Sequence, residues 1–286
     1  MGVRVVTDST NYIATEDLQR LRIERAPLWV HDGSEMRPET DIDLAAFYRR
    51  LADVDHIPTS SQPSPEALAN AFAAAAADGS EVLGAFISEK MSGTAQAARL
   101  AANIVQETQP DARIEVLDTE SNSMQEGYAV LAAAEVAIAG GTMEECIRAA
   151  RETMKRTRFL FTPHTLEYLI RGGRISKASA LVGSLLKITP VLTVENGVTD
   201  VAAKVRTRKR ALDEIASRMR ADVERCGLRR AVVHAIVDVE EATRFARELI
   251  DPIAADRVEV VPIGPVVGLH VGPAVAVVYE TEEPLR

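Results

Sequence analysis

The chain of 286 residues carries 33 Lys and Arg against 42 Asp and Glu, a formal net charge of −9 at pH 7. This acidic balance argues against a non-specific nucleic-acid binder, because such a protein needs excess basic residues to neutralise phosphates. The length exceeds the usual size of one compact core and predicts two subdomains.

Cysteine usage and hydropathy indicate a cytoplasmic protein. Cys146 and Cys226 lie far apart without the spacing of metal ligands, which favours free thiols in a reducing cytosol. The N-terminus opens directly into a predicted strand, and no apolar stretch reaches the about 20 residues that cross a bilayer. We therefore expect a soluble, cytoplasmic protein without a transmembrane segment. Transient contact with a membrane surface is compatible with this expectation.

The first half of the chain alternates short apolar strands with longer helices. This alternation predicts a parallel sheet covered by helices on both faces. The predicted strands are Val3–Asp8, Arg25–Val30, Val82–Ile87 and Arg113–Asp118; the predicted helices are Glu16–Arg22, Leu44–Ala52, Pro65–Asp78, Ala95–Glu107, Gln125–Ala139 and Thr142–Arg156.

Polar segments directly follow three of these strands, namely Asp8–Thr10, Ser88–Thr94 and Asp118–Ser123. Ligands of parallel sheets gather at the carboxyl ends of the strands. The three segments are therefore candidates for convergence on one crevice.

Serine and threonine hydroxyls crowd two turns, Thr59–Ser64 and Ser88–Thr94, each followed by an Ala-rich helical stretch. A helix N-terminus exposes unpaired N–H groups and the positive end of the helix dipole. Hydroxyl donors at two such ends suit a carboxylate or a phosphate. Taken singly, each turn is better explained as a helix cap, and Ser64-Pro65-Glu66 is a good helix start by itself.

The second half mixes helices with a sheet and predicts an α+β lobe. We place the boundary between domains 1–157 and 158–286. Asn196-Gly197 between two apolar runs predicts a hairpin. The predicted helices are Thr165–Ile170, Lys177–Lys187, Lys209–Arg225 and Glu240–Ile250; the predicted strands are Pro190–Val194, Val198–Ala203, Arg230–Val237, Val258–Pro262 and Ala274–Tyr279.

Three further segments carry candidate chemistry. The glycines of Arg171–Ser176 permit a tight turn, and its arginines suit an anion, although a helix C-cap explains the glycines equally well. The basic run Lys204–Arg210 is most simply a solvated helix start, but its charges oppose the dipole of that helix, which leaves a docking patch for a phosphate-bearing partner as the alternative. His270 lies in Gly264–Ala274, a predicted tight loop. A lone histidine is more often a hydrogen-bonded structural residue, but here it is also a candidate for binding an anion or transferring a proton.

A serine hydrolase is the main enzymatic alternative, with Ser92 or Ser60 as nucleophile and His270 as base. Neither serine lies in the Gly-x-Ser-x-Gly pattern of α/β-hydrolases, which weakens this reading. A metal enzyme is weaker still, because no His, Asp and Glu cluster shows ligand spacing, and no nucleotide-binding motif is visible.

Taken together and in this order, the motifs resemble those of the DegV family, the bacterial fatty-acid-binding proteins. The resemblance runs the whole length of the chain. The matching segments are Val6–Thr10, Thr59–Ser64, Met91–Thr94, Leu169–Ser176, Gly183–Pro190, Lys204–Arg210 and Gly268–Gly272.

The resemblance implies two lobes, an N-terminal Rossmann-like parallel α/β domain and a C-terminal α+β domain with a mixed sheet, with a long-chain fatty acid between them. It implies a non-enzymatic carrier, without cofactor or metal, that presents the fatty acid to a separate ATP-dependent kinase subunit making acyl phosphate for phospholipid synthesis. The implied carboxylate ligands are Ser60, Ser92, Ser61, Thr94, Arg174 and His270; the implied kinase-docking residues are Arg206, Arg208 and Lys209.

The chain departs from the family pattern in three places. Ser60 stands where Thr is common, and Asp118-Thr119 stands where Asp-Ser is usual; both changes retain the polar groups. Glu89-Lys90-Met91 replaces a small, Gly-containing stretch and bears on acyl chain-length preference. Aliphatic candidates for lining the acyl tail lie in Ile170–Ile188 and Val260–Leu269, although an ordinary core role explains each of these residues at least as well. A serine-dependent esterase or thioesterase, or a carrier of another amphipathic acid, remains the alternative.

Overall fold

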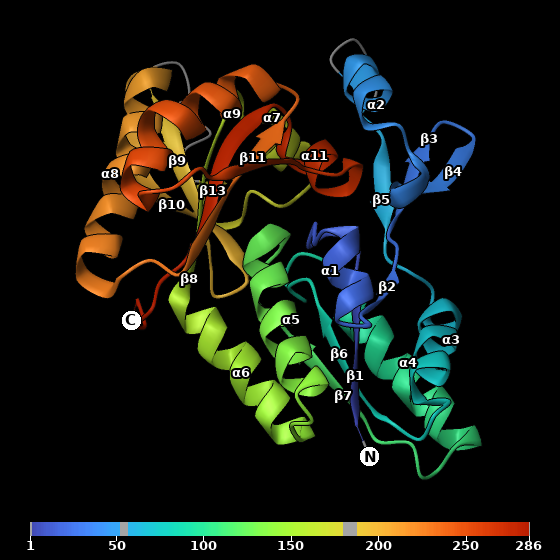
Figure 1. Cartoon of the computed structure of the whole chain (residues 1–286). Coiled ribbons are helices and arrows are strands. Elements are labelled where there is room, and N and C mark those ends of the chain that lie inside the picture. The colour runs from blue at the N-terminus through green and yellow to red at the C-terminus, as the bar shows by residue number, and fades with distance from the viewer. Residues whose placement is uncertain (1, 52–56, 180–187, 286) are drawn as a thin grey trace. The chain divides into compact units, whose positions relative to one another are not determined.

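The computed structural model describes residues 2–51, 57–179 and 188–285 (Figure 1). The chain forms two compact units: the first comprises Met1–Asp41 and Ser60–Met154, and the second comprises Ile42–Thr59 and Lys155–Arg286. The division predicted from the sequence, 1–157 and 158–286, differs mainly in residues 42–59, which the structure groups with the second unit.

A four-stranded parallel sheet forms the centre of the first unit, as the alternation of strands and helices predicts. Its strand order is β2-β1-β6-β7. The strands are β1 (Val3–Asp8), β2 (Glu24–Ala26), β6 (Glu81–Phe86) and β7 (Ile114–Asp118). The helices are α1 (Thr15–Arg20), α3 (Pro65–Ala76), α4 (Thr94–Thr108), α5 (Ser123–Ile138) and α6 (Met143–Arg156). Figure 1 shows α3 and α4 on one side of this sheet and α5 on the other.

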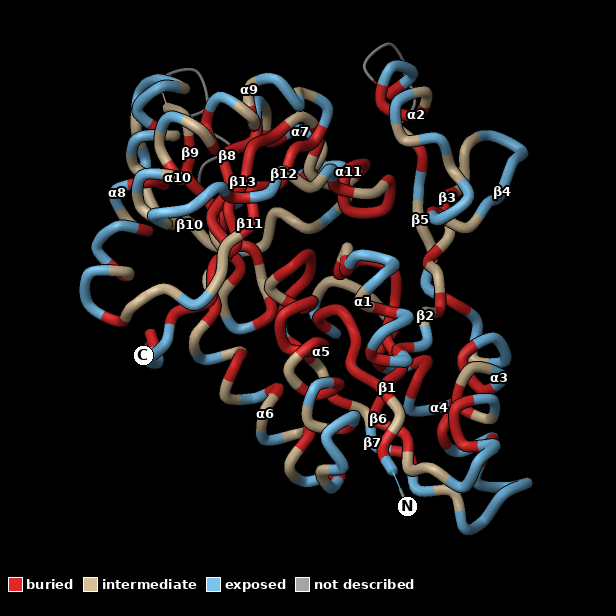
Figure 2. Tube along the Cα trace, in the orientation of Figure 1, coloured by how far each residue is buried: buried red, intermediate tan, exposed pale blue. Residues whose placement is uncertain are grey.

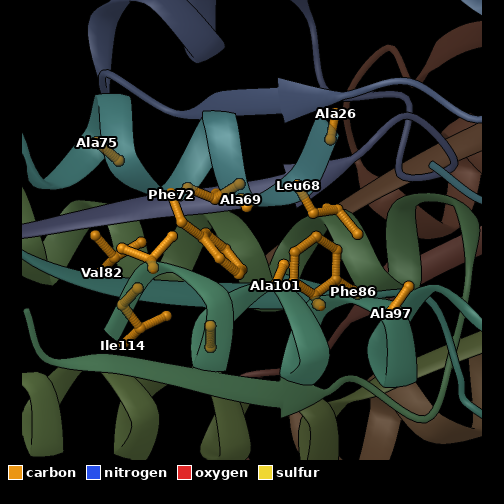
Figure 3. Packing of buried hydrophobic residues seen from close by; sticks show 14 of the residues in the cluster. Ala26, Leu68, Ala69, Phe72, Ala75, Val82, Phe86, Ala97, Ala101 and Ile114 are labelled. Atoms are coloured by element: carbon orange, nitrogen blue, oxygen red, sulfur yellow. The ribbon is translucent and has the colours of Figure 1, made fainter. Parts of the chain in front are cut away.

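Two phenylalanines fill the layer between the sheet and helices α3 and α4 (Figure 3). Phe72 of α3 and Phe86 of β6 are both fully buried, and their rings meet edge to face with centroids 6.2 Å apart. Gly84 leaves room for this pair, since a Cβ there would lie 2.6 Å from the Phe86 ring. The small residues of α4, such as Ala101, let that helix approach the sheet closely.

The predicted strand Arg25–Val30 is wrong, because the structure splits it between two sheets. Pro27 has no N–H to continue a ladder, and the chain leaves β2 there. The second part enters a three-stranded sheet of order β4-β3-β5. Its strands are β3 (Trp29–Asp32), β4 (Glu35–Pro38) and β5 (Thr59–Ser61); the short helix η1 (Glu39–Asp41) and helix α2 (Leu44–Leu51) lie between β4 and β5 in the chain.

A six-stranded mixed sheet forms the centre of the second unit and confirms the predicted α+β class. The strand order is β10-β9-β8-β13-β11-β12, antiparallel except for the parallel pair β11 and β12. The strands are β8 (Thr157–Pro163), β9 (Thr189–Glu195), β10 (Val198–Val205), β11 (Arg230–Ile236), β12 (Glu259–Pro262) and β13 (Ala274–Glu280). The helical segments are α7 (Glu167–Arg171), α8 (Arg208–Cys226), α9 (Val239–Phe245), the π-helical η3 (Ala246–Ile250), α10 (Asp251–Ala254) and α11 (Pro265–Val271).

Helices α8 and α9 cover one face of this sheet with a continuous apolar layer that includes Leu160, Ile215 and Phe245. Every residue of β13 is buried (Figure 2). The predicted hairpin is confirmed between β9 and β10: Asn196 has φ 51° and Gly197 has φ 79°, the left-handed pair that such a turn requires.

Two predicted segments of the second unit, Gly264–Ala274 and Lys177–Lys187, have different outcomes. The predicted loop Gly264–Ala274 is wrong, because Pro265–Val271 forms helix α11. Gly264 precedes it as N-cap, Pro265 occupies the favourable first helical position, and Gly272 ends the helix at φ 70°. The predicted helix Lys177–Lys187 and the segment Gly183–Pro190 fall largely on residues 180–187, which lie outside the described residues.

No helix in the described part of the chain is both long enough and apolar enough to cross a membrane.

Candidate functional site

The strand order places a topological switch point in the first unit. From β1 the chain continues to β2 on one side, and from β6 it continues through α4 to β7 on the other. The switch point therefore lies between the carboxyl ends of β1 and β6. Ligands of open parallel sheets bind at such a point, and both strands lead there into polar loops.

The loops after β1, β6 and β7 converge within the first unit, as the sequence predicts. The N–H of Ser88 donates to the carbonyl of Ser121 at 2.8 Å, and the N–H of Ser123 donates to the carbonyl of Thr10 at 2.9 Å. These bonds join the β6 loop to the β7 loop, and the β7 loop to the β1 loop. The turn that carries Ser92 is thus bonded to the loop after β7, which is bonded in turn to the loop after β1.

Ser92 is partly exposed just ahead of α4, and its oxygen is engaged by Thr94. The backbone N–H of Thr94 donates to Ser92 Oγ at 3.3 Å, and the two side-chain oxygens lie 2.9 Å apart. Thr94 itself is fully buried. When the Thr94 hydroxyl donates to Ser92, the Ser92 hydrogen is directed to a further acceptor. Gly93, the N-cap residue of α4, has no side chain to cap the helix, and the first turn holds no acidic residue.

The N-terminus of α3 is arranged differently. Ser64 Oγ accepts the N–H of Ala67 at 3.1 Å, and Glu66 adds a negative charge in the first turn. Ordinary capping therefore explains Ser64. The rest of that turn reaches towards α4 instead, because a Cβ on Gly93 would meet the amide nitrogen of Gln62 at 2.9 Å. The turn Thr59–Ser64 and the turn Ser88–Thr94 are therefore in close contact, through Gln62 and Gly93.

His31 belongs to this group, although the sequence singled out no role for it. Its Nε2 lies 2.7 Å from Ser61 Oγ. The contact joins β3 to β5 in the small sheet, two strands that are separated by 30 positions at this point. Ser61 can donate to a ligand only when His31 carries its hydrogen on Nε2, because otherwise the Ser61 hydrogen is directed at the imidazole. Ser60, the neighbouring candidate, is partly exposed.

Arg174 and His270 lie together in the second unit. Arg174 Nη1 donates to the carbonyl of Gly172, and a Cβ on Gly172 would meet His270 Nδ1 at 2.5 Å. Burial, and next the charge of Arg174, lower the pKa of His270 to about 4. Burial also lowers the pKa of Arg174. At neutral pH this turn presents a neutral imidazole beside a guanidinium, a combination suited to an anion.

The two glycines of Gly268–Gly272 have a packing role. A Cβ on Gly268 would lie 2.0 Å from the hydroxyl of Tyr48, which donates to the carbonyl of Ile263 at 2.8 Å. This contact fixes α2 against α11 and accounts for the membership of residues 42–59 in the second unit. A Cβ on Gly272 would likewise meet the ring of Tyr168 at 2.2 Å. Both glycines, which flank His270 in the chain, are thus needed for the close approach of a tyrosine.

The basic run begins helix α8, but its members differ in environment. Arg208 binds both carboxylate oxygens of Glu241, at 2.9 and 2.6 Å, and donates to the carbonyl of Thr162. It thereby ties α8 to α9 and β8. Arg206 and Lys209 are exposed. Arg208 is therefore engaged within the fold, whereas the other two side chains are accessible to a partner.

The described residues offer no metal site, and the pocket found in the second unit is small. They contain no group of three or more His, Cys, Asp or Glu that would hold a metal ion. A pocket of about 180 Å³ in the second unit is lined by Pro163–Leu166 and Ile188–Pro190. It is smaller than the about 300–1,000 Å³ typical of small-molecule sites, so we do not assign the acyl tail to it.

Comparisons with known proteins agree along the whole chain. A family model with the description "Uncharacterised protein, DegV family" matches residues 2–282. The chain is 43% identical over 292 residues to a DegV domain-containing protein of Clostridium acetobutylicum, with 100% of both chains covered. It is 33% identical over 275 residues to Protein DegV of Bacillus subtilis, covering 95% of this chain and 96% of that one.

Two solved structures are similar over nearly the full length. One is DegV, a fatty acid binding protein from Bacillus subtilis, with a TM-score of 0.88, 31% identity, and coverage of 98% of this chain and 99% of that one. The other concerns fatty acid binding of a DegV family protein from Thermus thermophilus, with a TM-score of 0.86, 30% identity, and coverage of 98% and 100%.

Proposed function

The chain belongs to the DegV family, and on this basis we propose that it binds a long-chain fatty acid whose carboxylate is held by hydroxyl groups of the first unit. The ligating residues are Ser60, Ser61, Ser92 and Thr94, with Ser92 as the principal donor and Thr94 acting through it. Two DegV structures similar to this chain are of fatty-acid-binding proteins, which supports the choice of ligand.

One observation carries the proposal: the N-terminus of α4 has neither a side-chain cap nor an acidic residue, whereas the N-terminus of α3 has both. The first turn of α4 has no acidic residue, and Ser92 is oriented by two contacts from Thr94. The first turn of α3 is already capped by Ser64 and charged by Glu66. A carboxylate is stabilised by the N-terminal dipole of α4 and by the hydroxyl hydrogens.

The acyl tail would supply most of the affinity, and the hydroxyls would fix the orientation. Burial of about fifteen methylenes contributes up to roughly 12 kcal/mol before ordering costs, at about 0.8 kcal/mol each. A hydrogen bond to a charged carboxylate contributes about 1.5–3 kcal/mol. Val266 and Leu269 of α11 are buried aliphatic candidates from the predicted range Val260–Leu269.

We propose the same carboxylate-binding role for Arg174 and His270. The support is the resemblance of their motifs to those of the family, together with the joint position of the two side chains on the Gly172 turn. Their contribution is tested separately from that of the hydroxyls, by replacing each residue alone.

We further propose that the protein is a non-enzymatic carrier that presents the fatty acid to a separate, ATP-dependent kinase subunit. Because ATP is the phosphate donor, we assign this step to the cytoplasm. The exposed cations Arg206 and Lys209 would dock the kinase. The prediction made from the sequence also included Arg208, but its guanidinium is bound by Glu241 and Thr162. We therefore leave it out of the docking surface.

The kinase proposal is tested by charge reversal. Arg206→Glu with Lys209→Glu should impair acyl-phosphate formation from palmitate and ATP by the kinase subunit, while palmitate still binds. Arg220→Glu, an exposed charge reversal farther along α8, is the matched control and should leave the reaction unchanged. Equal loss in both variants, or no loss in either, would contradict a specific docking role.

A serine-dependent esterase or thioesterase is the second candidate function, favoured by the 2.7 Å contact between Ser61 Oγ and His31 Nε2. A hydrolase also needs a group that orients the other imidazole nitrogen. Within the described residues His31 shows no hydrogen bond to a carboxylate. Labelling of Ser61, Ser60 or Ser92 by a fluorophosphonate probe would support the hydrolase; absence of labelling supports the carrier.

The proposed function is tested by native mass spectrometry of the protein purified from a bacterial host, followed by denaturing release and identification of lipids. The expected result is one fatty acid per chain. Absence of a bound lipid, followed by failure of added palmitate to bind, would overturn the carrier. Release of a different amphipathic acid would replace the fatty acid as the ligand.

A further inference from the structure

Two fully buried carboxyl groups lie next to each other beneath the hydroxyl turn, and the proposed ligand contacts use neither. Asp8 ends β1, and Glu126 lies in the first turn of α5. Both residues are 0% exposed. Buried carboxylates are normally compensated by a cation. Neither group forms an ion pair with a basic side chain in residues 2–51, 57–179 and 188–285.

The hydrogen bonds around Asp8 identify it as the ionised member. Its Oδ1 accepts the N–H of Thr10 at 2.8 Å and the hydroxyl of Thr10 at 2.6 Å. Its Oδ2 accepts the N–H of Ile87 at 2.8 Å. Two backbone N–H groups favour the charged carboxylate. The single hydrogen of the Thr10 hydroxyl is therefore directed to Asp8.

Glu126 must then supply the hydrogen of the next bond. Its Oε2 lies 3.0 Å from Thr10 Oγ1, whose hydrogen Asp8 already takes. This contact is a hydrogen bond only when Glu126 is protonated and donates to Thr10. On the other side, Asn11 donates to Thr7 Oγ1 at 2.9 Å, and Thr7 is left to donate to Glu126 Oε1 at 3.5 Å. One proton on Glu126 Oε2 satisfies every contact.

The electrostatic environment agrees with this assignment. Burial, and next the charge of Asp8, raise the pKa of Glu126 well above its usual range. Burial also raises the pKa of Asp8, but hydrogen bonds from Thr10 and Ile87 oppose that rise. The charged group facing Glu126 from β1 is Asp8; the side chains of Thr7, Thr10 and Asn11 that also face it are neutral.

The pair is connected to the candidate ligand residues through the backbone. Ile87, which Asp8 holds, directly precedes Ser88 and the turn that ends in Ser92 and Thr94. The segment after β1 is fixed as well, because Thr10 accepts the N–H of Ser123. Asp8 and Thr10, which are bonded to each other and to Glu126, therefore hold backbone on both sides of the loops that carry the hydroxyl turn.

We propose that Asp8 and Glu126 hold a single proton, placed on Glu126 and bridged by the Thr10 hydroxyl, and that this pair is the positioning element for the carboxylate-binding turn Ser88–Thr94. The positioning role rests on the proposed fatty-acid binding, whereas the shared proton does not. Removal of the proton at alkaline pH places two negative charges on either side of Thr10 and breaks the Glu126–Thr10 bond. Fatty-acid affinity should therefore fall as the pH rises through the range in which Glu126 ionises.

Glu126→Gln is the decisive variant, because its amide N–H replaces the acid proton and donates to Thr10 at every pH. We expect it to bind palmitate as the wild type does at neutral pH and to lack the alkaline loss. Glu126→Ala should weaken binding by about tenfold or more, since Thr10 loses its donor. Equal weakening in both variants, or an alkaline loss that persists in Glu126→Gln, would overturn the positioning role.

The shared proton is measured separately, without any ligand, by infrared spectroscopy of the carboxyl region. The wild type minus Glu126→Gln difference at pH 7 should contain the carbonyl band of a protonated carboxylic acid, which disappears at alkaline pH. Absence of this band at pH 7 would overturn the pair even if palmitate binds. Its presence in a protein that fails to bind palmitate would retain the pair and overturn the proposed function and the positioning role that rests on it.

Discussion

At the scale of single residues, a hydroxyl that binds a carboxylate needs a hydrogen that its neighbours do not take. Ser92 meets this requirement when the Thr94 hydroxyl donates to it, because the Ser92 oxygen then accepts from Thr94 and its own hydrogen is directed to a further acceptor. Ser64 differs in its surroundings, because its oxygen caps α3 and the first turn of that helix already carries the negative charge of Glu66. Two serines that look alike in the sequence therefore have different roles.

This contrast gives a first prediction. Ser92→Ala should weaken palmitate binding by about 10- to 150-fold, the equivalent of a hydrogen bond to a charged group of about 1.5–3 kcal/mol. Ser64→Ala is the matched control and should cost about 1 kcal/mol of stability through loss of the cap, with affinity retained. Isothermal titration with palmitate measures the first effect, and urea unfolding measures the second. Similar affinities in the two variants would contradict the assignment.

A second prediction concerns the charge state of His270. Burial and the Arg174 guanidinium lower the pKa of His270 to about 4, so Arg174→Gln should raise it. The new value should stay below 6.5, because burial is the larger cause. NMR titration of the imidazole signals checks this. His234, whose pKa is also lowered to about 4 but by burial and without Arg174, is an internal control that should not move.

The sequence predicted most of these residues but not His31. Ser60, Ser61, Ser92 and Thr94 stand in recognisable motifs, whereas His31 has no motif around it. Its contact with Ser61 depends on β3 and β5 belonging to the same small sheet. Because the strand prediction for this region was wrong, that neighbour relation was not accessible from the sequence.

At the scale of elements, the strongest sequence signals were the boundaries marked by Gly, Pro and Asn. The hairpin at Asn196-Gly197 is confirmed for this reason. Strand β8 was missed, although it is a central strand of its sheet, because it begins at Thr157 directly after α6 ends at Arg156. No turn residue separates the two. Helix α11 was predicted as a loop because its glycines and prolines also suit a cap, a first helical turn and a helix end.

The fit of α2 on α11 gives a third prediction. In Gly268→Ala the new methyl group would lie 2.0 Å from the Tyr48 hydroxyl. We expect a loss of about 1–3 kcal/mol of stability through overpacking. In a Tyr48→Ala background the sign should reverse, because Ala is favoured over Gly in a helix by about 1 kcal/mol. A double-mutant cycle by urea unfolding measures this coupling. An unchanged cost in the second background would contradict the contact.

At the scale of the whole molecule, buried histidines connect folding stability to pH. Burial lowers the pKa of His234, on the central strand β11, to about 4, and its Nδ1 lies 3.0 Å from the carbonyl of Val261. The unfolded chain, with a pKa near 6.5, binds a proton that the folded chain does not. Stability is therefore complete above pH 6.5 and falls as the pH drops towards 4, by about 3 kcal/mol for this residue.

The fourth prediction follows from this sign. His234→Asn keeps a donor for Val261 but cannot titrate, so it should flatten the acid side of the stability profile between pH 6.5 and 4. Urea unfolding at several pH values measures the difference between the two proteins. His270 remains in both and contributes in the same direction. An equal acid slope in wild type and variant would contradict the neutral, buried state of His234.

The fold class of both units was predictable from the sequence, because strand and helix alternation in one half and a mixed pattern in the other are visible there. The grouping of residues 42–59 with the second unit was not, since it depends on Tyr48 reaching the carbonyl of Ile263, 215 positions away. The sequence likewise did not show that Arg208 is engaged within the fold while Arg206 and Lys209 are exposed, because the partner of Arg208 is the distant Glu241.

The central claim is that the protein recognises the carboxylate of a fatty acid. It is tested most directly by titrating the lipid-free protein with palmitate and with methyl palmitate, followed by native mass spectrometry. The two ligands share a tail and differ at the head group. We predict one palmitate per chain and binding of the ester that is weaker by about tenfold or more. Equal binding of the two, or no binding of palmitate, would contradict the account.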